Sequence, residues 1–264
     1  MGKPKNWSKE MQQQICKEYL EGESSLDIGR KLGVSSVSII EIIKKNNIRR
    51  RDLSHACQNY KLNEEFFFSI DNEQKAYWLG FISADGHLDI NKCSLSISLS
   101  NKDKKHLATF LNHLNSNHPI KEYNYSYGNF VRIYIGNKRL STSLKIFMDN
   151  NKTHTLRFPA ISKALEHHFI RGYFDGDGCV SGNRKNPQFS ITSNLFFLKE
   201  LKKRFLLIDL TDTKNDVRHK DKPEIQTLRY CGVNNLIKLH NYLYKNATLY
   251  LDRKKEKFEN VIKN

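Results

Sequence analysis

Two aspartates, Asp85 and Asp177, stand at corresponding places in two similar segments of the sequence. Each ends an apolar stretch of helical character and is followed by a glycine, Gly86 or Gly178, suited to a left-handed helix end. A carboxylate at a helix C-terminus is unfavourable, because the helix dipole stabilises cations there. An Asp-Gly pair often marks a plain turn, but breaking the dipole rule at two equivalent places favours a functional role for both acids.

Each acid follows a helix face made of small residues. Gly80 and Ala84 form this face in the first segment, and Gly172 and Gly176 form it in the second. A spacing of four residues puts both members on one side of a helix, where small side chains allow another backbone to approach. Tight packing alone would explain one such face. Two of them predict that the helices pack against each other about a pseudo-twofold axis and bring the acids together.

Two adjacent carboxylates repel each other unless a cation lies between them. Carboxylate oxygens are hard ligands of the kind that Mg²⁺ prefers, with water and phosphate oxygens completing its coordination. The sequence therefore predicts that Asp85 and Asp177 bind a divalent cation, either Mg²⁺ or another such as Mn²⁺.

The elements that position the acids form an internal repeat, in which residues 73–150 and 160–264 each read helix, two strands, helix, two strands, helix. The segment 94–100 alternates strictly, with leucine and isoleucine on one face and serine on the other. The segments 131–135 and 189–192 alternate in the same way. We therefore expect an α+β fold. The outward polar positions are Ser96, Ser98, Arg132, Tyr134, Ser190 and Thr192.

Residues 8–50 predict three short helices, over 8–20, 26–32 and 36–45, with a tight turn at Gly33 before the last. This is the helix-turn-helix pattern, whose last helix enters the major groove of DNA. We expect Val37, Ile40 and Ile43 to form the buried face of that helix. The predicted DNA contacts are Ser35, Ser36, Ser38, Lys44, Lys45, Arg49, Arg50 and Arg51. A plain three-helix bundle with a basic tail is the alternative.

The predicted organisation is therefore a helix-turn-helix domain at 1–52, a polar linker at 53–72 and a two-repeat domain at 73–264. The linker ends in Phe66-Phe67-Phe68, which we expect to dock on the second domain rather than stack on bases.

Charge and composition narrow the class of partner. Lysine plus arginine outnumber aspartate plus glutamate by 44 to 28, a net charge of +16, which predicts a polyanionic partner. No apolar stretch is long enough for a membrane span, and the N-terminus lacks a signal peptide. The five cysteines are scattered, which argues against disulfides or a thiolate zinc site. We expect an intracellular protein of the cytoplasm, nucleoid or an organelle, with no membrane partner.

The segments 78–86 and 170–178 resemble the LAGLIDADG motif of homing endonucleases, and the resemblance covers about residues 66–264. Ser83 departs from the motif, which has an acid there, but that acid is not a metal ligand in the family. Arg171 and Tyr173 also depart from it. The resemblance implies two αββαββα units about a pseudo-twofold axis, with antiparallel strands that form a saddle in the major groove of DNA. The outward polar positions of those strands would then contact base edges.

The resemblance further implies a monomeric, Mg²⁺-dependent endonuclease that cuts both strands of a long, specific DNA target and leaves 3′ overhangs. Asp85 and Asp177 would be its metal-binding acids. Family members place a basic residue from each half near the cleavage centre, and Lys152 and Lys254 are the candidates here. Asn101 and Asn194 would hold a solvent network around the metals. Two alternatives on the same fold remain open: a non-cleaving transcription regulator and a maturase that binds intron RNA.

Overall fold

Two hydrophobic clusters build two structural units, Met1–Asn59 and Tyr60–Asn264. The computed structural model describes residues 7–21, 23–48, 60–126, 128–210, 217–219 and 222–263, with backbone alone for 217–219 and 222–224. Arg49, Arg50 and Arg51, and most of the predicted linker, lie outside the described residues. No helix in the described ranges is long and apolar enough to cross a membrane.

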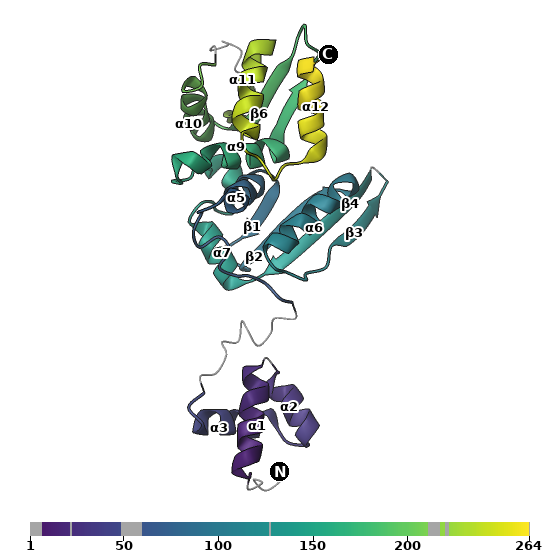
Figure 1. Ribbon diagram of the computed structural model, residues 1–264, viewed down its shortest axis with the longest axis vertical. Helices are drawn as coiled ribbons and strands as arrows, with labels where there is room; N and C mark the ends of the chain where they lie inside the picture. The colour runs from purple at the N-terminus through teal and green to yellow at the C-terminus, as the bar shows by residue number, and fades with distance from the viewer. Residues whose placement is uncertain are drawn as a thin grey trace. The chain divides into compact units, whose positions relative to one another are not determined.

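The first unit contains α1 (Lys9–Leu20), α2 (Ser25–Leu32) and α3 (Ser36–Lys45), shown in Figure 1. Each helix begins after a serine whose side chain accepts a hydrogen bond from a backbone N–H in the first turn. Gly33 ends α2 in the left-handed conformation, with φ of 66°. The three short helices and the glycine turn that the sequence predicts are therefore present.

The buried face of α3 differs from the predicted one. Ile39, Ile42 and Ile43 are buried, whereas Val37 is 62% exposed and Ile40 is only partly covered. Two apolar stripes run along this helix, and both have helical spacing. Packing against α1 and α2 selects the stripe that contains Ile39 and Ile42, so the prediction of Val37 and Ile40 is wrong.

The second unit contains two repeats with the same order of elements, each followed by one further helix. The first comprises α5 (Glu73–Asp85), β1 (Gly86–Asp89), β2 (Ser94–Ser100), the 3₁₀ helix η1 (Asn101–Asp103), α6 (Lys104–His113), β3 (Lys121–Tyr125), β4 (Gly128–Gly136), α7 (Lys138–Lys145) and α8 (Lys152–Thr155). The second comprises α9 (Lys163–Asp177), β5 (Gly178–Ser181), β6 (Gln188–Asn194), α10 (Leu195–Leu206), β7 (Val217–His219), β8 (Lys222–Cys231), α11 (Val233–Tyr244) and α12 (Asp252–Lys263). The α+β fold and the αββαββα order are confirmed.

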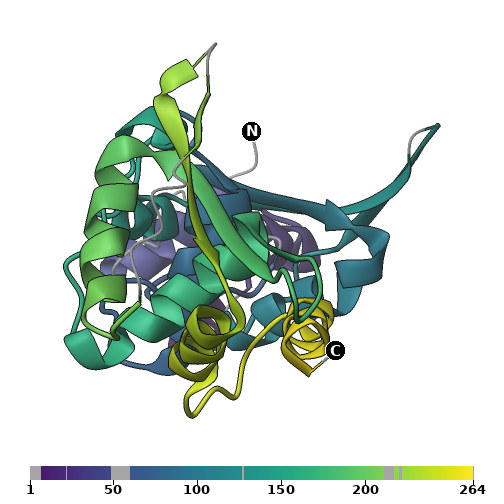
Figure 2. The same ribbon diagram turned by 90° about the horizontal axis from the view of Figure 1, so that it is seen from above.

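Each repeat forms one four-stranded antiparallel sheet, in the orders β1-β2-β4-β3 and β5-β6-β8-β7. On β2 the side chains of Leu95, Ile97 and Leu99 are buried in the core. The register pairs Ser96 with Tyr134 and Ser98 with Arg132, so these polar residues share the opposite face. The hairpins β3–β4 and β7–β8 extend away from the centre of the unit (Figure 2).

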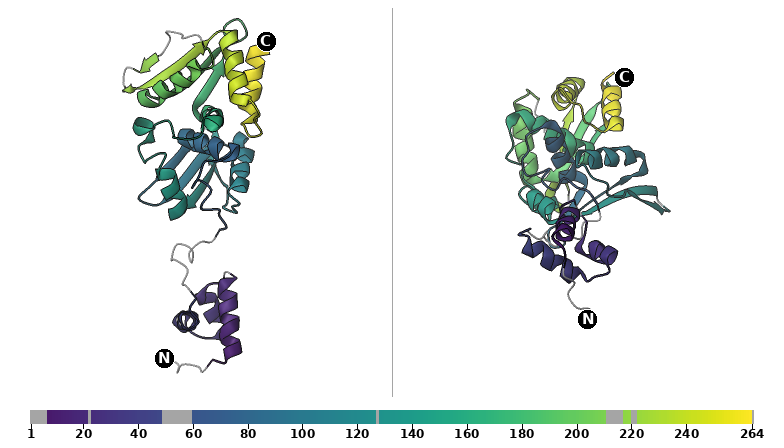
Figure 3. Two further views of the ribbon diagram at one scale, coloured as in Figure 1. Left: turned by 60° about the vertical axis from the view of Figure 1, so that its left-hand side comes forward. Right: turned by 60° about the horizontal axis from the view of Figure 1, so that its bottom comes forward.

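The helices α5 and α9 lie side by side between the two sheets (Figure 1), and they form the most extensive helix contact in the unit. At the C-terminal end, α12 packs beside α11 (Figure 3). The last part of the predicted linker, residues 60–72, belongs to this unit rather than to a linker, because its aromatic side chains enter the core. Phe66 and Phe67 are buried there as predicted, whereas Phe68 is 79% exposed.

Candidate functional site

Glycines at the contact between α5 and α9 set how closely the two helices approach. A Cβ atom on Gly80 would lie 2.0 Å from the carbonyl oxygen of Phe169, and one on Gly172 would lie 1.9 Å from that of Tyr77. A Cβ on Gly176 would lie 2.4 Å from the Cβ of Ala84. The small faces of both helices therefore meet, as the spacing of these residues predicts.

This contact brings the two acids together at one end of the helix pair. Asp85 is the last residue of α5 and Asp177 is the last residue of α9. The Oδ2 atom of Asp85 lies 3.3 Å from the position of a Cβ on Gly176, one residue before Asp177. Asp85 is half-buried and Asp177 is exposed, so a ligand can reach both carboxylates.

The glycines that follow the acids do not adopt the predicted left-handed conformation. Gly86 and Gly178 are extended, with φ of −74° and −77°. A side chain is excluded there by packing, because a Cβ on Gly86 would lie 2.6 Å from Cγ2 of Ile82 and one on Gly178 would lie 2.1 Å from Cδ2 of Phe174. Each helix therefore passes directly into the first strand of its repeat, and the acid marks the junction.

The electrostatics of the site favour a cation between the acids. The pKa of Asp85 is raised from 3.8 to about 6, first by burial and next by the nearby charge of Asp177. Restricted hydration also raises the pKa of Asp177, against the opposing effect of Lys152 and Lys254. No cluster of three acid, histidine or cysteine side chains occurs in the described parts of the chain. The protein thus offers two hard carboxylate ligands, which fit Mg²⁺ or Mn²⁺ when substrate and water supply the others.

A lysine lies beside each helix end. The Nζ atom of Lys152 donates to the carbonyl oxygens of Ile82 (3.0 Å) and Ser83 (2.9 Å) and to that of Ala84, at the C-terminus of α5. The Nζ atom of Lys254 donates to the carbonyl oxygen of Gly178, directly after α9. Burial lowers the pKa of Lys152 to about 8, although both acids oppose this shift. The two lysines therefore occupy equivalent places in the two repeats. The ammonium group of each places positive charge near the acids.

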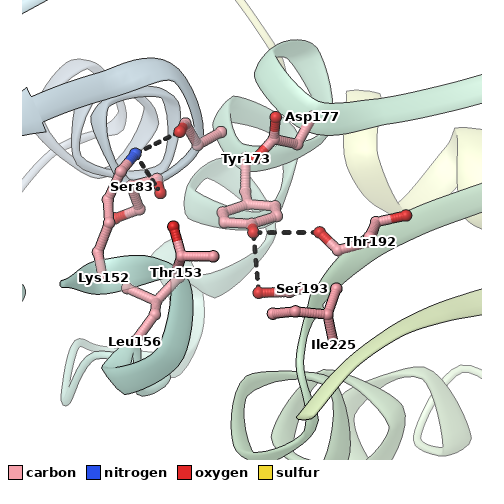
Figure 4. A pocket seen from close by; sticks show the side chains of 10 residues that line it. Ser83, Lys152, Thr153, Leu156, Tyr173, Asp177, Thr192, Ser193 and Ile225 are labelled. Atoms are coloured by element: carbon pink, nitrogen blue, oxygen red, sulfur yellow. Dashed lines mark hydrogen bonds between the residues drawn. The ribbon is translucent and has the colours of Figure 1, made fainter. Parts of the chain in front are cut away.

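A cavity of about 210 Å³ opens beside Asp177 and Lys152 (Figure 4). In its wall the hydroxyl of Tyr173 donates a hydrogen bond to Oγ of Ser193 at 2.9 Å. The remaining lining residues are Ser83, Ala84, Thr153, Leu156, Thr192 and Ile225. Residues from both repeats form this wall, so the cavity lies where the two repeats meet.

The two asparagines that were expected beside the metals lie in different surroundings. Asn101 is exposed at the start of η1. Asn194 is only 1% exposed, accepts a hydrogen bond from the backbone N–H of Phe197 and donates to the carbonyl oxygen of Leu156. The amide of Asn194 thus caps α10 and ties it to the segment after α8, which leaves it shielded from any solvent network.

Comparison with known proteins finds one family match, which lies within the second repeat. Residues 164–244, which span α9 to α11, match the family described as LAGLIDADG-like domain. No curated protein matches the sequence.

Several solved structures are similar to this chain. The homing endonuclease I-WcaI bound to its DNA recognition sequence is similar with a TM-score of 0.51 and 13% identity, over 74% of this chain and 91% of that chain. The LAGLIDADG meganuclease I-AabMI bound to uncleaved DNA gives a TM-score of 0.46 and 15% sequence identity, over 73% of this chain and 90% of that chain. The full-length DUF199/WhiA from Thermatoga maritima gives a TM-score of 0.47 and 18% sequence identity, over 76% of this chain and 64% of that chain. The first of these likenesses confirms the fold that the sequence predicts.

The polar strand positions of the second unit face away from its core. Ser98, Arg132 and Tyr134 are exposed, and Ser96, Ser190 and Thr192 are partly covered. Cross-strand neighbours on the same faces add residues that the sequence analysis missed. They are His87 opposite Ser96, Tyr123 on β3 and Arg229 opposite Ser190. The alternation of β1, β3 and β8 was the signal that would have identified them.

In the first unit, the predicted DNA contacts divide into two groups. Ser35 caps α3, and its Oγ atom lies 3.0 Å from that of Ser38. Ser36 is partly covered, and Lys44 and Lys45 are exposed at the opposite end of α3.

The raised pKa of Asp85 predicts how stability depends on pH. Between its ordinary pKa of 3.8 and about 6, the folded state holds a proton that the unfolded state has lost. The free energy of unfolding therefore falls as the pH rises through this window. In metal-free buffer the difference in melting temperature between Asp85→Asn and wild type should grow in favour of the variant as the pH rises. Calorimetric melting at several pH values measures this difference. A difference in melting temperature that does not change with pH would contradict the raised pKa of Asp85.

Proposed function

We propose that the chain is a monomeric, site-specific endonuclease of double-stranded DNA that hydrolyses phosphodiester bonds with a divalent cation. The observation that supports this most strongly is the pairing of Asp85 with Asp177, each with a lysine at the end of its own helix. Because both halves come from one chain, a single molecule supplies one acid and one lysine for each DNA strand. The staggered break with 3′ overhangs belongs to the same proposal.

Asp85 and Asp177 would hold Mg²⁺ or Mn²⁺, which would supply an activated water nucleophile and would stabilise charge on the leaving oxygen. The chain itself supplies the geometry. The close contact of α5 and α9 holds the carboxylates together against their repulsion, and Lys152 and Lys254 place positive charge next to them. A cation at this position favours the extra negative charge that develops on a phosphate during hydrolysis.

The proposed DNA surface consists of the polar faces of the two sheets. Serine, threonine, arginine and tyrosine side chains offer the donors and acceptors that major-groove readout requires. The net charge of +16 favours a phosphate backbone as partner. The similar homing endonuclease I-WcaI is bound to its DNA recognition sequence, which supports the same kind of partner here.

The activity is tested by incubating the protein with genomic DNA and Mg²⁺ and sequencing the new ends. We expect breaks at one long recurrent sequence, with 3′ overhangs visible in the paired end positions. Specific binding without any break would indicate a transcription regulator. Binding of a folded intron RNA in place of DNA would indicate a maturase, and either result would overturn the endonuclease proposal.

We further propose that the first unit is a helix-turn-helix that binds DNA next to the main target through α3 and Arg49, Arg50 and Arg51. Deleting residues 1–59 leaves the whole second unit and both acids intact. The shortened protein should therefore cut the same bonds at saturating concentration. Its affinity should fall, its footprint should shorten on one side and its salt dependence should weaken, because fewer phosphates are neutralised.

Footprinting and a salt titration of both proteins on one target measure this effect. An unchanged footprint together with an unchanged salt slope would show that the first unit is a helical bundle without a role on this DNA.

A further inference from the structure

The segment before α12 is held by a carboxylate of the other repeat. Glu73, the first residue of α5, accepts hydrogen bonds from the backbone N–H groups of Thr248 (2.8 Å) and Leu249 (3.1 Å). Its second oxygen accepts from the hydroxyl of Thr248 at 2.7 Å. Three donors from one short segment of the second repeat therefore converge on one first-repeat side chain.

A buried arginine reinforces this attachment and explains one departure from the LAGLIDADG motif. Arg171 of α9 is fully buried, and it donates to Glu73 at 2.6 Å, to the carbonyl oxygen of Leu249 at 2.9 Å and to that of Leu243 at 2.7 Å. A buried charge of this kind is costly unless it is paired and hydrogen-bonded. Glu73 and Arg171 are fully hydrogen-bonded only when residues 248–249 lie in this position, so the pair fixes the segment there.

A second ion pair crosses between the repeats at the start of α12. Arg253 donates from Nε to Oδ1 of Asp103 at 2.8 Å and from Nη2 to Oδ2 at 2.7 Å. Asp103 lies in η1 of the first repeat and is only 5% exposed. This bidentate contact fixes the orientation of the Arg253 side chain as well as its distance from Asp103. The next residue is Lys254, whose Nζ contacts Gly178.

We propose that Glu73 and Asp103 are positioning residues for Lys254, so that cleavage at one half of the site depends on carboxylates of the other half. This inference rests on the proposed endonuclease function. Glu73 holds the backbone just before α12, and Asp103 holds the side chain of Arg253 in the first turn of α12, next to Lys254. Without them the lysine remains in the chain, but its ammonium group is no longer held beside the end of α9.

Strand-specific cleavage tests this role, because a merely structural effect slows both strands together. A duplex target with a different label on each strand reports both rates in one single-turnover experiment with Mg²⁺. Lys254→Met identifies the strand whose cleavage depends on Lys254, because that strand should be slowed most. Lys152→Met should slow the other strand most. Asp103→Ala and Glu73→Gln should slow the Lys254 strand by about tenfold to a hundredfold, the scale on which small misplacements lower rates, and the other strand far less.

Glu166→Gln is the matched control. Glu166 of α9 accepts from Arg204 at 2.8 Å in an ion pair that is also mostly buried, but neither residue bonds to the segment at 248–254. This variant should keep the wild-type ratio of strand rates even where its melting temperature falls. Melting temperatures of all variants are measured beside the rates.

Equal slowing of both strands by Asp103→Ala and Glu73→Gln, or a wild-type ratio in both, would overturn the inference while leaving the endonuclease proposal intact. Wild-type protein that cleaves neither strand would overturn the endonuclease proposal and the inference with it.

Discussion

Replacement of Asp177 by asparagine is expected to abolish double-strand cleavage while DNA binding persists. The change keeps the size of the side chain but removes one of the two charged ligands at the ends of α5 and α9. A bound metal contributes several kcal/mol to charge stabilisation in the transition state, so its loss should slow cleavage by about a thousandfold or more. Asp85→Asn should have the same effect. Cleavage rates and gel-shift affinities on one target measure both quantities.

Asp71→Asn is the control for this experiment. It makes the same chemical change at an acid whose side chain is 55% exposed and pairs with Lys75. Its cleavage rate should match that of the wild type. Full activity of the double variant Asp85→Asn, Asp177→Asn would exclude both residues as metal ligands.

Gly172→Ala is expected to destabilise the second unit strongly, although it adds a single methyl group. The new Cβ would lie 1.9 Å from the carbonyl oxygen of Tyr77 and 2.9 Å from the backbone nitrogen of Phe81. Backbone atoms in a helix cannot move aside as a side chain can, so α5 and α9 must separate. We expect a loss of about 3 kcal/mol or more in the free energy of unfolding, at the upper end of what overpacking costs. Urea denaturation measures it, and cleavage should fall with it because the acids move apart.

Gly136→Ala provides the comparison. A Cβ on Gly136 meets only Cε1 of Tyr134, at 3.7 Å, which is an ordinary contact. This variant should unfold close to the wild-type midpoint. If Gly172→Ala also did so, the close approach of the two helices would be refuted.

Local sequence patterns determined most of the secondary structure. The serine and leucine alternation of 94–100 is β2, because side chains alternate between the two faces of a strand. Serine before a helix and glycine after it marked the ends of α2, since these residues satisfy backbone groups that a helix leaves unpaired. The twin small faces predicted the contact of α5 with α9 for a similar reason, because close backbone approach requires small residues at that spacing.

Where a sequence pattern fits two structures equally well, tertiary contacts decide between them. The third helix has two apolar stripes, and only the neighbouring helices choose Ile39 and Ile42 over Val37 and Ile40. Gly86 and Gly178 look like ordinary helix-ending glycines, but the packing of Ile82 and Phe174 against them is the reason that no side chain fits.

The surroundings of the site were likewise decided by the tertiary structure. The sequence singled out Asp85 and Asp177 because each breaks a local rule of helix composition. Nothing local distinguishes Glu73 or Asp103 from other acids, since their partners Thr248 and Arg253 lie in the other repeat. A sequence determines the periods and ends of its own elements, because these depend on neighbouring residues. Which distant side chains meet depends on the packing of whole elements, and only the folded chain sets that.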